Sequence, residues 1–441
     1  MSEQRVLSLR AAILININIM LGAGIFLNTV KLAGPAGSLG GFAYLIAGIL
    51  MFPLVLSIAR LTSIHPEGGF YAFGKNELSP LAGFVSAWSY FIGKLASGAL
   101  MIHFSLALVQ RLIPAFQHAH LILLDFVVIV FFVLLNMLNV KAGSRIQTMF
   151  TILKLIPITF AILTGMFLFQ GAHFGSTHRL WAGIPSVLPF LFYATMGFEA
   201  ACLLCNKIKN PEKNAPRAIL FSFGIALTIA ALYQTFFYGA LGSQLSKFFI
   251  YDAGYLYAFP ALLGKLLPTS PILATQLKGI LHLALASSAL GGAYGIMFSN
   301  TWNLYTLANN GHLFFKKLFT KLNSHAIPVA CVVVEGAIYA SYLFVSGGMQ
   351  EALQVLSSFG VVLAYTVSVI ALLSAKLKRP KTKIPTWLPA FGLISCSIFI
   401  FTCLAGLMQK GFSSLMLFAA LLGLGVIMFF ATAPKRKDAR A

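Results

Sequence analysis

Long apolar segments recur along the whole chain, and short polar stretches separate them. Most of these segments hold about 20 predominantly apolar residues, the length that an α-helix needs to cross the hydrocarbon core of a bilayer. The pattern predicts an all-α polytopic membrane protein with 12 transmembrane helices. The predicted spans are residues 10–31, 39–59, 81–109, 121–139, 146–169, 184–205, 218–240, 274–307, 328–346, 352–374, 388–409 and 413–432.

The first predicted span contains three small residues in a row, Gly22, Ala23 and Gly24, within the stretch INIMLGAGIF at 17–26. Glycine costs about 1 kcal/mol relative to alanine inside a helix, and it lets the backbone leave helical geometry. Broken helices often point their half-helix ends at a substrate near the bilayer midplane, where free amide N–H groups favour a carboxylate. Close helix packing through small residues explains the same stretch equally well. Both interpretations stay open at this point.

The composition agrees with a membrane protein, because apolar residues make up 59% of the 441 residues and charged residues only 9%. A soluble protein could not bury so large an apolar surface. The formal net charge is +21, but the basic residues lie in short loops and not on one face. This distribution is typical of membrane topology and argues against a nucleic-acid partner.

The basic residues also predict the orientation of the chain. Of the 31 lysines and arginines, 22 lie on the side shared with the two termini and six on the opposite side. Both termini should therefore be cytoplasmic, in the cell membrane. The basic tail at 434–441 suits the anionic headgroups of membrane lipid. Residues 242–273 leave open a re-entrant or interfacial segment, since a further span there would break the even parity.

Motifs for catalysis or metal binding are missing from the sequence. We find no P-loop, HExxH, GxSxG or zinc-ligand spacing. Cys202 and Cys205 close an apolar segment without histidine or cysteine partners, and reduced apolar thiols explain them best. We therefore expect neither an enzyme nor a bound cofactor or metal.

An acidic residue, Glu199, lies inside the sixth predicted span. A charged residue at the bilayer centre costs roughly 2.5–3.5 kcal/mol on insertion scales, so it is rarely without a function. Burial favours the protonated form of a carboxyl group, which makes Glu199 a candidate proton carrier. A structural glutamate, protonated or bonded to a neighbouring helix, is the alternative.

Several motifs together resemble the amino acid–polyamine–organocation (APC) superfamily of amino acid permeases. The resemblance covers about residues 10–330 by motif and the remainder by hydropathy. It rests on GAGIF, LAGPAG, SIARLTSIHPEGGFYAFGKNELSP and GFVSAW in the first quarter, NVKAGSRIQTMFTILKLIPI at 139–158, FYATMGFEAACLLCNKIKNPEKNAPRAI at 192–219 and LYTLANNGHLFFKKLF at 304–319.

This resemblance implies the leucine-transporter fold, a single transporter domain over 1–441. It implies a first inverted repeat of five spans over 10–169 and a second over 184–374, with spans one and six broken. Two peripheral helices over 388–432 complete the expected fold.

The resemblance also implies the position of the substrate. The backbone amides of the segment Gly22, Ala23, Gly24 and Ile25 are expected to receive the substrate α-carboxylate. A second break around Ala194 to Gly197 would offer carbonyls to the α-ammonium, because half-helix C-terminal ends carry partial negative charge. Tyr193 matches an aromatic gate over the substrate, although a lipid-facing or interfacial tyrosine is the alternative.

Two lysines carry the expectations about coupling and selectivity. By resemblance, the Lys154 ammonium takes the place of a sodium ion between spans one and eight, where Ser287 and Ser288 supply hydroxyls; snorkelling to the interface is the alternative. Lys94 lies near the middle of the third span, where a charge is costly. It is either a countercharge for an acidic substrate or an internal partner of Glu199.

We therefore expect secondary active transport of amino acids or related amines by alternating access, as proton symport or as exchange against a counter-substrate. A sodium-coupled or acidic-amino-acid-selective carrier is the alternative within transport. A non-transporting sensor or a channel with the same fold is the alternative outside it. Isolated polar residues in the spans, instead of a continuous polar stripe, argue against the channel.

Overall fold

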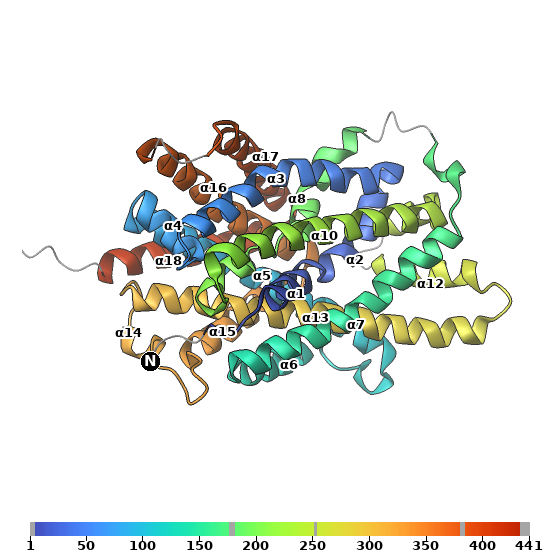
Figure 1. Cartoon of the computed structure of the whole chain (residues 1–441). Helices are drawn as coiled ribbons and strands as arrows, with labels where there is room; N and C mark the ends of the chain where they lie inside the picture. The colour runs from blue at the N-terminus through green and yellow to red at the C-terminus, as the bar shows by residue number, and fades with distance from the viewer. Residues whose placement is uncertain (1–4, 176–180, 251–253, 380–383, 433–441) are drawn as a thin grey trace, which may run out of the picture.

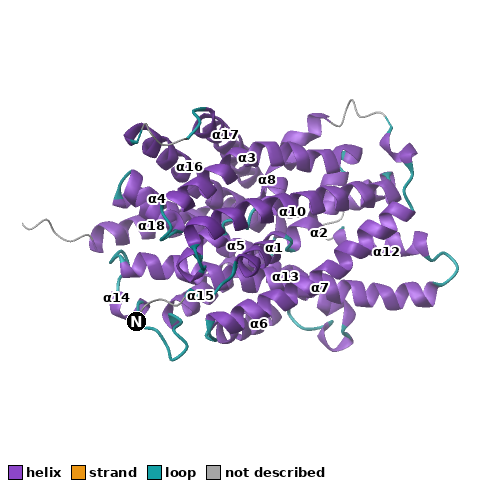
Figure 2. Cartoon of the chain, viewed as in Figure 1, coloured by secondary structure: helices purple, strands orange, loops and turns teal. Residues whose placement is uncertain are grey.

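The protein is described by a computed structural model that covers residues 5–175, 181–250, 254–379 and 384–432, so the basic tail lies outside the described residues. Over these ranges the regular structure is helical, as predicted, with one isolated β-bridge between Leu7 and Ile208 (Figure 2). The long helices are α3 (Gly40–Ile64), α5 (Pro80–Leu112), α7 (Val140–Phe167), α10 (Pro211–Leu241), α13 (Pro271–Asn309), α15 (Val329–Ser346), α16 (Gln350–Lys378), α17 (Trp387–Lys410) and α18 (Phe412–Thr432). The shorter helices are α1 (Leu9–Met20), α2 (Ala23–Ala33), α4 (Gly69–Glu77), α6 (Leu121–Asn136), α8 (Ile184–Thr195), α9 (Ala200–Leu203), α11 (Ser243–Lys247), α12 (Tyr255–Leu266) and α14 (Lys316–Phe319).

Nine helices in the described ranges are long and apolar enough to cross a membrane. The pair α1 and α2, bent by 41° at its break, adds a tenth candidate span. Two more apolar helices, α6 and the stretch Trp181–Thr195, are shorter. The polytopic all-α architecture is thus confirmed, while the count of 12 and the inverted repeat stay predictions.

The long helices lie side by side in one bundle, and α5 runs through its interior (Figure 1). Its main neighbours are α13 and α16, and it is the most deeply buried of the long helices. Helices α17 and α18 bury the smallest share of their surface. The N-terminus and the end of α18 lie at the same end of the bundle (Figure 1), as an even number of crossings would require.

Side-chain caps mark where several helices begin. Ser8 accepts a hydrogen bond from the backbone N–H of Ala11 at the start of α1. Ser79 and Asn139 do the same for α5 and α7, and Pro80 occupies the first position of α5. These caps satisfy amide groups that have no partner within the helix.

Residues 242–273 do not form a further span in the described part of the chain. They contain the short helices α11 and α12 and the start of α13. Helix α12 packs against α2, α10 and α13. Twelve residues of helix rise about 18 Å, well short of the roughly 30 Å hydrocarbon core. The chain here covers one end of the bundle.

Helices α5 and α16 approach closely where two glycines meet. A Cβ atom on Gly93 would lie 2.7 Å from Cα of Gly360, and one on Gly360 would lie 2.6 Å from Cα of Gly93. Small residues at such a crossing let helix backbones approach within the membrane. No side chain fits between the two helices without moving one of them.

We expect Gly93→Leu to destabilise the protein by about 1–3 kcal/mol or more, because overpacking forces α5 and α16 apart. The measurement is the midpoint of thermal unfolding in detergent. Gly224→Leu is the matched control, since Gly224 lies on the exposed face of α10 and has no atom within 4 Å of its Cβ position. Equal midpoints for the two variants would contradict the close crossing.

A polar cluster joins α3, α4 and α16 at the end of the bundle that holds the termini. His65, at the end of α3, places Nε2 2.7 Å from Oε1 of the buried Glu77. Arg379 lies 3.1 Å from the same oxygen, and Lys378 donates to the Glu77 carbonyl at 2.5 Å. Hydrogen bonding to Glu67 raises the pKa of His65, and the same contact lowers the pKa of Glu67.

The His65 contacts should make stability depend on pH. A histidine with a raised pKa in the folded protein stabilises it fully below its ordinary pKa of 6.5, and this contribution is lost as pH rises through the raised value. We expect the gap in melting temperature between the wild type and His65→Gln to shrink from about pH 6 to about pH 8. Thermal unfolding in detergent measures it, and a constant gap would exclude a charged His65.

Candidate functional site

The first transmembrane segment is broken at the predicted place. Helix α1 ends at Met20, Leu21 and Gly22 leave helical geometry, and α2 begins at Ala23. The first amide groups of a helix have no partner within it, and they carry its partial positive charge. The N–H groups of Ala23, Gly24 and Ile25 belong to this first turn of α2. The break therefore presents an anion-binding helix end inside the bundle.

Lys154 lies at the other side of this break. Its ammonium group donates to the carbonyl oxygens of Asn18 and of Leu21, the latter at 3.0 Å. Ser288 of α13 donates to the same Leu21 carbonyl at 3.2 Å. Lys154 is fully buried, so its ammonium does not snorkel to an interface in this structure. Ser287 is half-buried and makes no such bond in the ranges described.

The second break lies between α8 and α9, two residues later than predicted. Helix α8 ends at Thr195, and Met196 to Glu199 form the unwound segment. Gly197 has φ +122°, a backbone conformation that side chains rarely adopt. Glu199, predicted inside the sixth span, directly precedes α9. Its Oε2 atom accepts the Gly197 N–H at 2.7 Å, which places the carboxylate at the break.

Two asparagines of α1, which sequence reasoning did not single out, find polar partners near the breaks, and Asn16 bonds to the second break itself. Asn16 donates to the Phe198 carbonyl at 2.6 Å and accepts the Ala201 N–H at 2.9 Å. Asn18 donates to the Gly291 carbonyl of α13 at 2.8 Å. The signal was present, since two asparagines within an apolar span must find polar partners in the protein.

Tyr193 covers the N-terminal end of α2. A Cβ atom on Gly24 would lie 2.9 Å from the Tyr193 ring and 3.1 Å from Cα of Ala194. The Tyr193 hydroxyl and the Ser97 hydroxyl of α5 are 2.8 Å apart and share a hydrogen bond. The ring is buried and therefore does not face lipid. The Tyr193 side chain thus links α8 to α5 beside the first break.

One face of α5 runs alongside both breaks in space. Tyr90, Lys94, Ser97 and Met101 are spaced three or four residues apart, so they share this face. Met101 lies against the first break, because a Cβ atom on Gly22 would come within 2.3 Å of its methyl group. Tyr90 and Lys94 each lie 3.0 Å from Oε1 of Glu199 at the second break. The structure thus brings Lys94 and Glu199 together as an internal pair.

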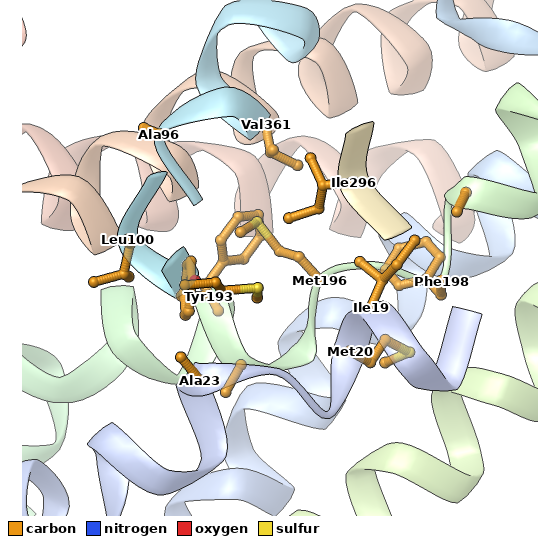
Figure 3. Packing of buried hydrophobic residues seen from close by; sticks show 14 of the residues in the cluster. Ile19, Met20, Ala23, Ala96, Leu100, Tyr193, Met196, Phe198, Ile296 and Val361 are labelled. Carbon is orange, nitrogen blue, oxygen red and sulfur yellow. The ribbon is translucent and has the colours of Figure 1, made fainter. Parts of the chain in front are cut away.

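The other side chains around the breaks are mainly apolar (Figure 3). Tyr193 of α8, Met196 and Phe198 of the unwound segment, and Ile19 of α1 lie together in one buried cluster. Ala96 and Leu100 of α5, Ile296 of α13 and Val361 of α16 belong to the same buried cluster. The charged side chains near the site are therefore those that make hydrogen bonds or ion pairs at the two breaks.

Two further buried acids lie away from the breaks, and sequence reasoning did not single them out. Asp125 of α6 pairs with His103 of α5 at 2.6 Å. Glu335 of α15 accepts a hydrogen bond from Thr301 of α13 at 2.9 Å. An acidic residue inside an apolar segment was the available signal. Groups of three or more histidine, cysteine or acidic residues that could hold a metal do not occur in the described ranges.

Comparison with known proteins identifies the family of this chain. A family model described as amino acid permease matches residues 7–430. An uncharacterized transporter of Mycobacterium tuberculosis is 25% identical over 436 residues, which cover 97% of this chain and 91% of that protein. The amino-acid permease RocE of Bacillus subtilis is 25% identical over 355 residues, which cover 76% of this chain and 72% of RocE.

A solved structure agrees on the fold. The manganese transporter of Eremococcus coleocola superposes with a TM-score of 0.62 at 15% identity, over 96% of this chain and 93% of that chain. At 15% sequence identity, this similarity supports a shared fold and nothing about function. The match of the family model over nearly the whole length is the stronger finding. The chain belongs to the amino acid permease family, whose members are membrane transporters for amino acids and related substrates.

Proposed function

We propose that the protein is a secondary active transporter that carries amino acids by alternating access around the two broken helices. The observation that carries this proposal is the pair of breaks that face each other inside the bundle, at Leu21–Gly22 and at Met196–Glu199. Unwound backbone at membrane depth is tolerated only where it is buried in protein or lines a cavity, and it is a common place for substrate.

The two helix ends match the two charged groups of an amino acid. The N-terminal end of α2, over Ala23, Gly24 and Ile25, favours the α-carboxylate. The C-terminal end of α8, near Ala194 and Gly197, offers carbonyl oxygens to the α-ammonium. Tyr193, bonded to Ser97, would open and close this site on one side.

Coupling to protons, or exchange against a counter-substrate, fits the site better than coupling to sodium. The Lys154 ammonium donates to two carbonyls of the first break, and Ser288 donates to one of them. A fixed cation thus occupies the oxygen atoms that a sodium ion would need. The bonds also hold the end of α1, where a positive charge is favourable.

We expect Gly24→Leu to lose uptake of radiolabelled amino acids into proteoliposomes. The new side chain would displace the Tyr193 ring and fill the space at the first turn of α2, where the carboxylate binds. Gly224→Leu, on the exposed face of α10, should keep wild-type uptake. Normal uptake by a folded Gly24→Leu variant would place the substrate elsewhere.

We expect wild-type uptake to be equal in sodium and in choline buffers, because Lys154 fills the cation position. An imposed pH gradient or internal unlabelled amino acid should drive accumulation instead. The measurement is uptake of an amino acid panel under each gradient in turn. Sodium-driven accumulation would contradict the role of Lys154, and the absence of any uphill flux would favour a sensor or a channel.

A further inference from the structure

Lys94 and Glu199 form an ion pair in the interior of the helix bundle. The Lys94 ammonium lies 3.0 Å from Oε1 of Glu199, and both side chains are buried. Glu199 is the hydrogen-bond acceptor of Lys94 among the described residues. The pair connects the middle of α5 to the break between α8 and α9. A conformational change that moves α8 and α9 against α5 must therefore keep or exchange this contact.

The Glu199 carboxylate has a full set of hydrogen-bond donors. Its Oε1 atom accepts from Lys94 and from the Tyr90 hydroxyl, both at 3.0 Å. Its Oε2 atom accepts from the Tyr365 hydroxyl at 2.8 Å and from the Gly197 N–H at 2.7 Å. Four donors, one of them charged, stabilise the ionised carboxylate. A proton on either oxygen would have to displace one of these donors.

The charge of Glu199 is balanced within the protein. The titratable groups that face it are Lys94 and Tyr90 of α5, Tyr365 of α16 and Cys202 of α9. Helices α1, α3, α4, α10 and α13 also pack against α9. Over the ranges that the structure covers, they bring no lysine, arginine or histidine within 4.0 Å of the carboxylate. Lys94 is thus the cation that neutralises Glu199.

We propose that Lys94 determines substrate specificity by holding Glu199 in an internal ion pair. The pair then adds no net charge to the substrate site, which takes amino acids with uncharged apolar side chains and works without a proton on Glu199. This inference rests on the proposed transport function. The apolar side chains around the breaks, among them Met196, Ile296 and Val361 (Figure 3), fit such a substrate.

Charged substrates meet a specific obstacle in this arrangement. An acidic side chain would need the Lys94 ammonium, which Glu199 already binds. A cationic side chain would need the Glu199 carboxylate, whose four donors fill both of its oxygens. Either substrate would leave one member of the pair buried without its partner, which is strongly unfavourable.

The test is exchange of radiolabelled leucine against internal leucine in proteoliposomes, with the same pH on both sides. Wild-type exchange should be nearly constant from about pH 5.5 to about pH 8, because the four donors leave no place for a proton on Glu199. In Lys94→Met, the buried Glu199 has lost its cation and needs a proton instead. Because that proton is lost as pH rises, exchange should fall at least about tenfold over this range.

The double variant Lys94→Met/Glu199→Gln is the matched control. Removing both partners of a buried pair is often neutral, whereas removing one leaves an uncompensated charge. We expect its leucine exchange to be independent of pH and to exceed that of Lys94→Met at about pH 8. A packing defect at position 94 that is unrelated to the charge of Glu199 would not be repaired by a second substitution at Glu199.

Several outcomes would overturn this inference. The first is a Lys94→Met variant whose leucine exchange equals that of the wild type and does not depend on pH. The second is a double variant that is no more active than Lys94→Met at about pH 8. The third is exchange of glutamate by the wild type that Lys94→Met abolishes. Failure of the proposed function is distinguishable, because the wild type would then exchange none of a panel of neutral and charged amino acids. A wild type that exchanges only charged amino acids would overturn the inference alone.

Discussion

Unwound backbone inside a membrane must find its hydrogen-bond partners within the protein, and the centre of this structure depends on that constraint. At the first break, Lys154 and Ser288 donate to the freed carbonyl groups. At the second, Asn16 donates to the Phe198 carbonyl, and Glu199 accepts the Gly197 N–H. These polar side chains therefore hold the two broken helices in place.

Helix α5 ties these contacts together, because one of its faces touches both breaks. Ser97 bonds Tyr193 next to α2, and one turn away Lys94 pairs with Glu199. Close approach of α5 to α16, through Gly93 and Gly360, keeps this face near the site. Movement of α8 and α9 relative to α5 would change the Tyr193–Ser97 contact and the ion pair at once.

Local sequence was sufficient for features that depend on local chemistry. Together with the family resemblance, the small residues Gly22 and Gly24 made the first break predictable from local sequence. It was insufficient for the second break, where the chain unwinds from Met196 to Glu199 instead of from Ala194. The positive φ of Gly197 and the contacts of Glu199 decide that position. Asn16 likewise gains its role only from residues far along the chain, such as Phe198.

By itself, the sequence determined a polytopic all-α membrane protein, its family and the first broken helix, because apolar length and small residues act through the adjacent backbone and the bilayer. It left open whether Lys94 serves a substrate or an internal carboxylate. Only the tertiary structure showed that the two side chains pair, since α5 places the ammonium 3.0 Å from Glu199, although the two residues are 105 positions apart. Pairing of buried charges depends on distance in space, which helix packing sets and which no local pattern encodes.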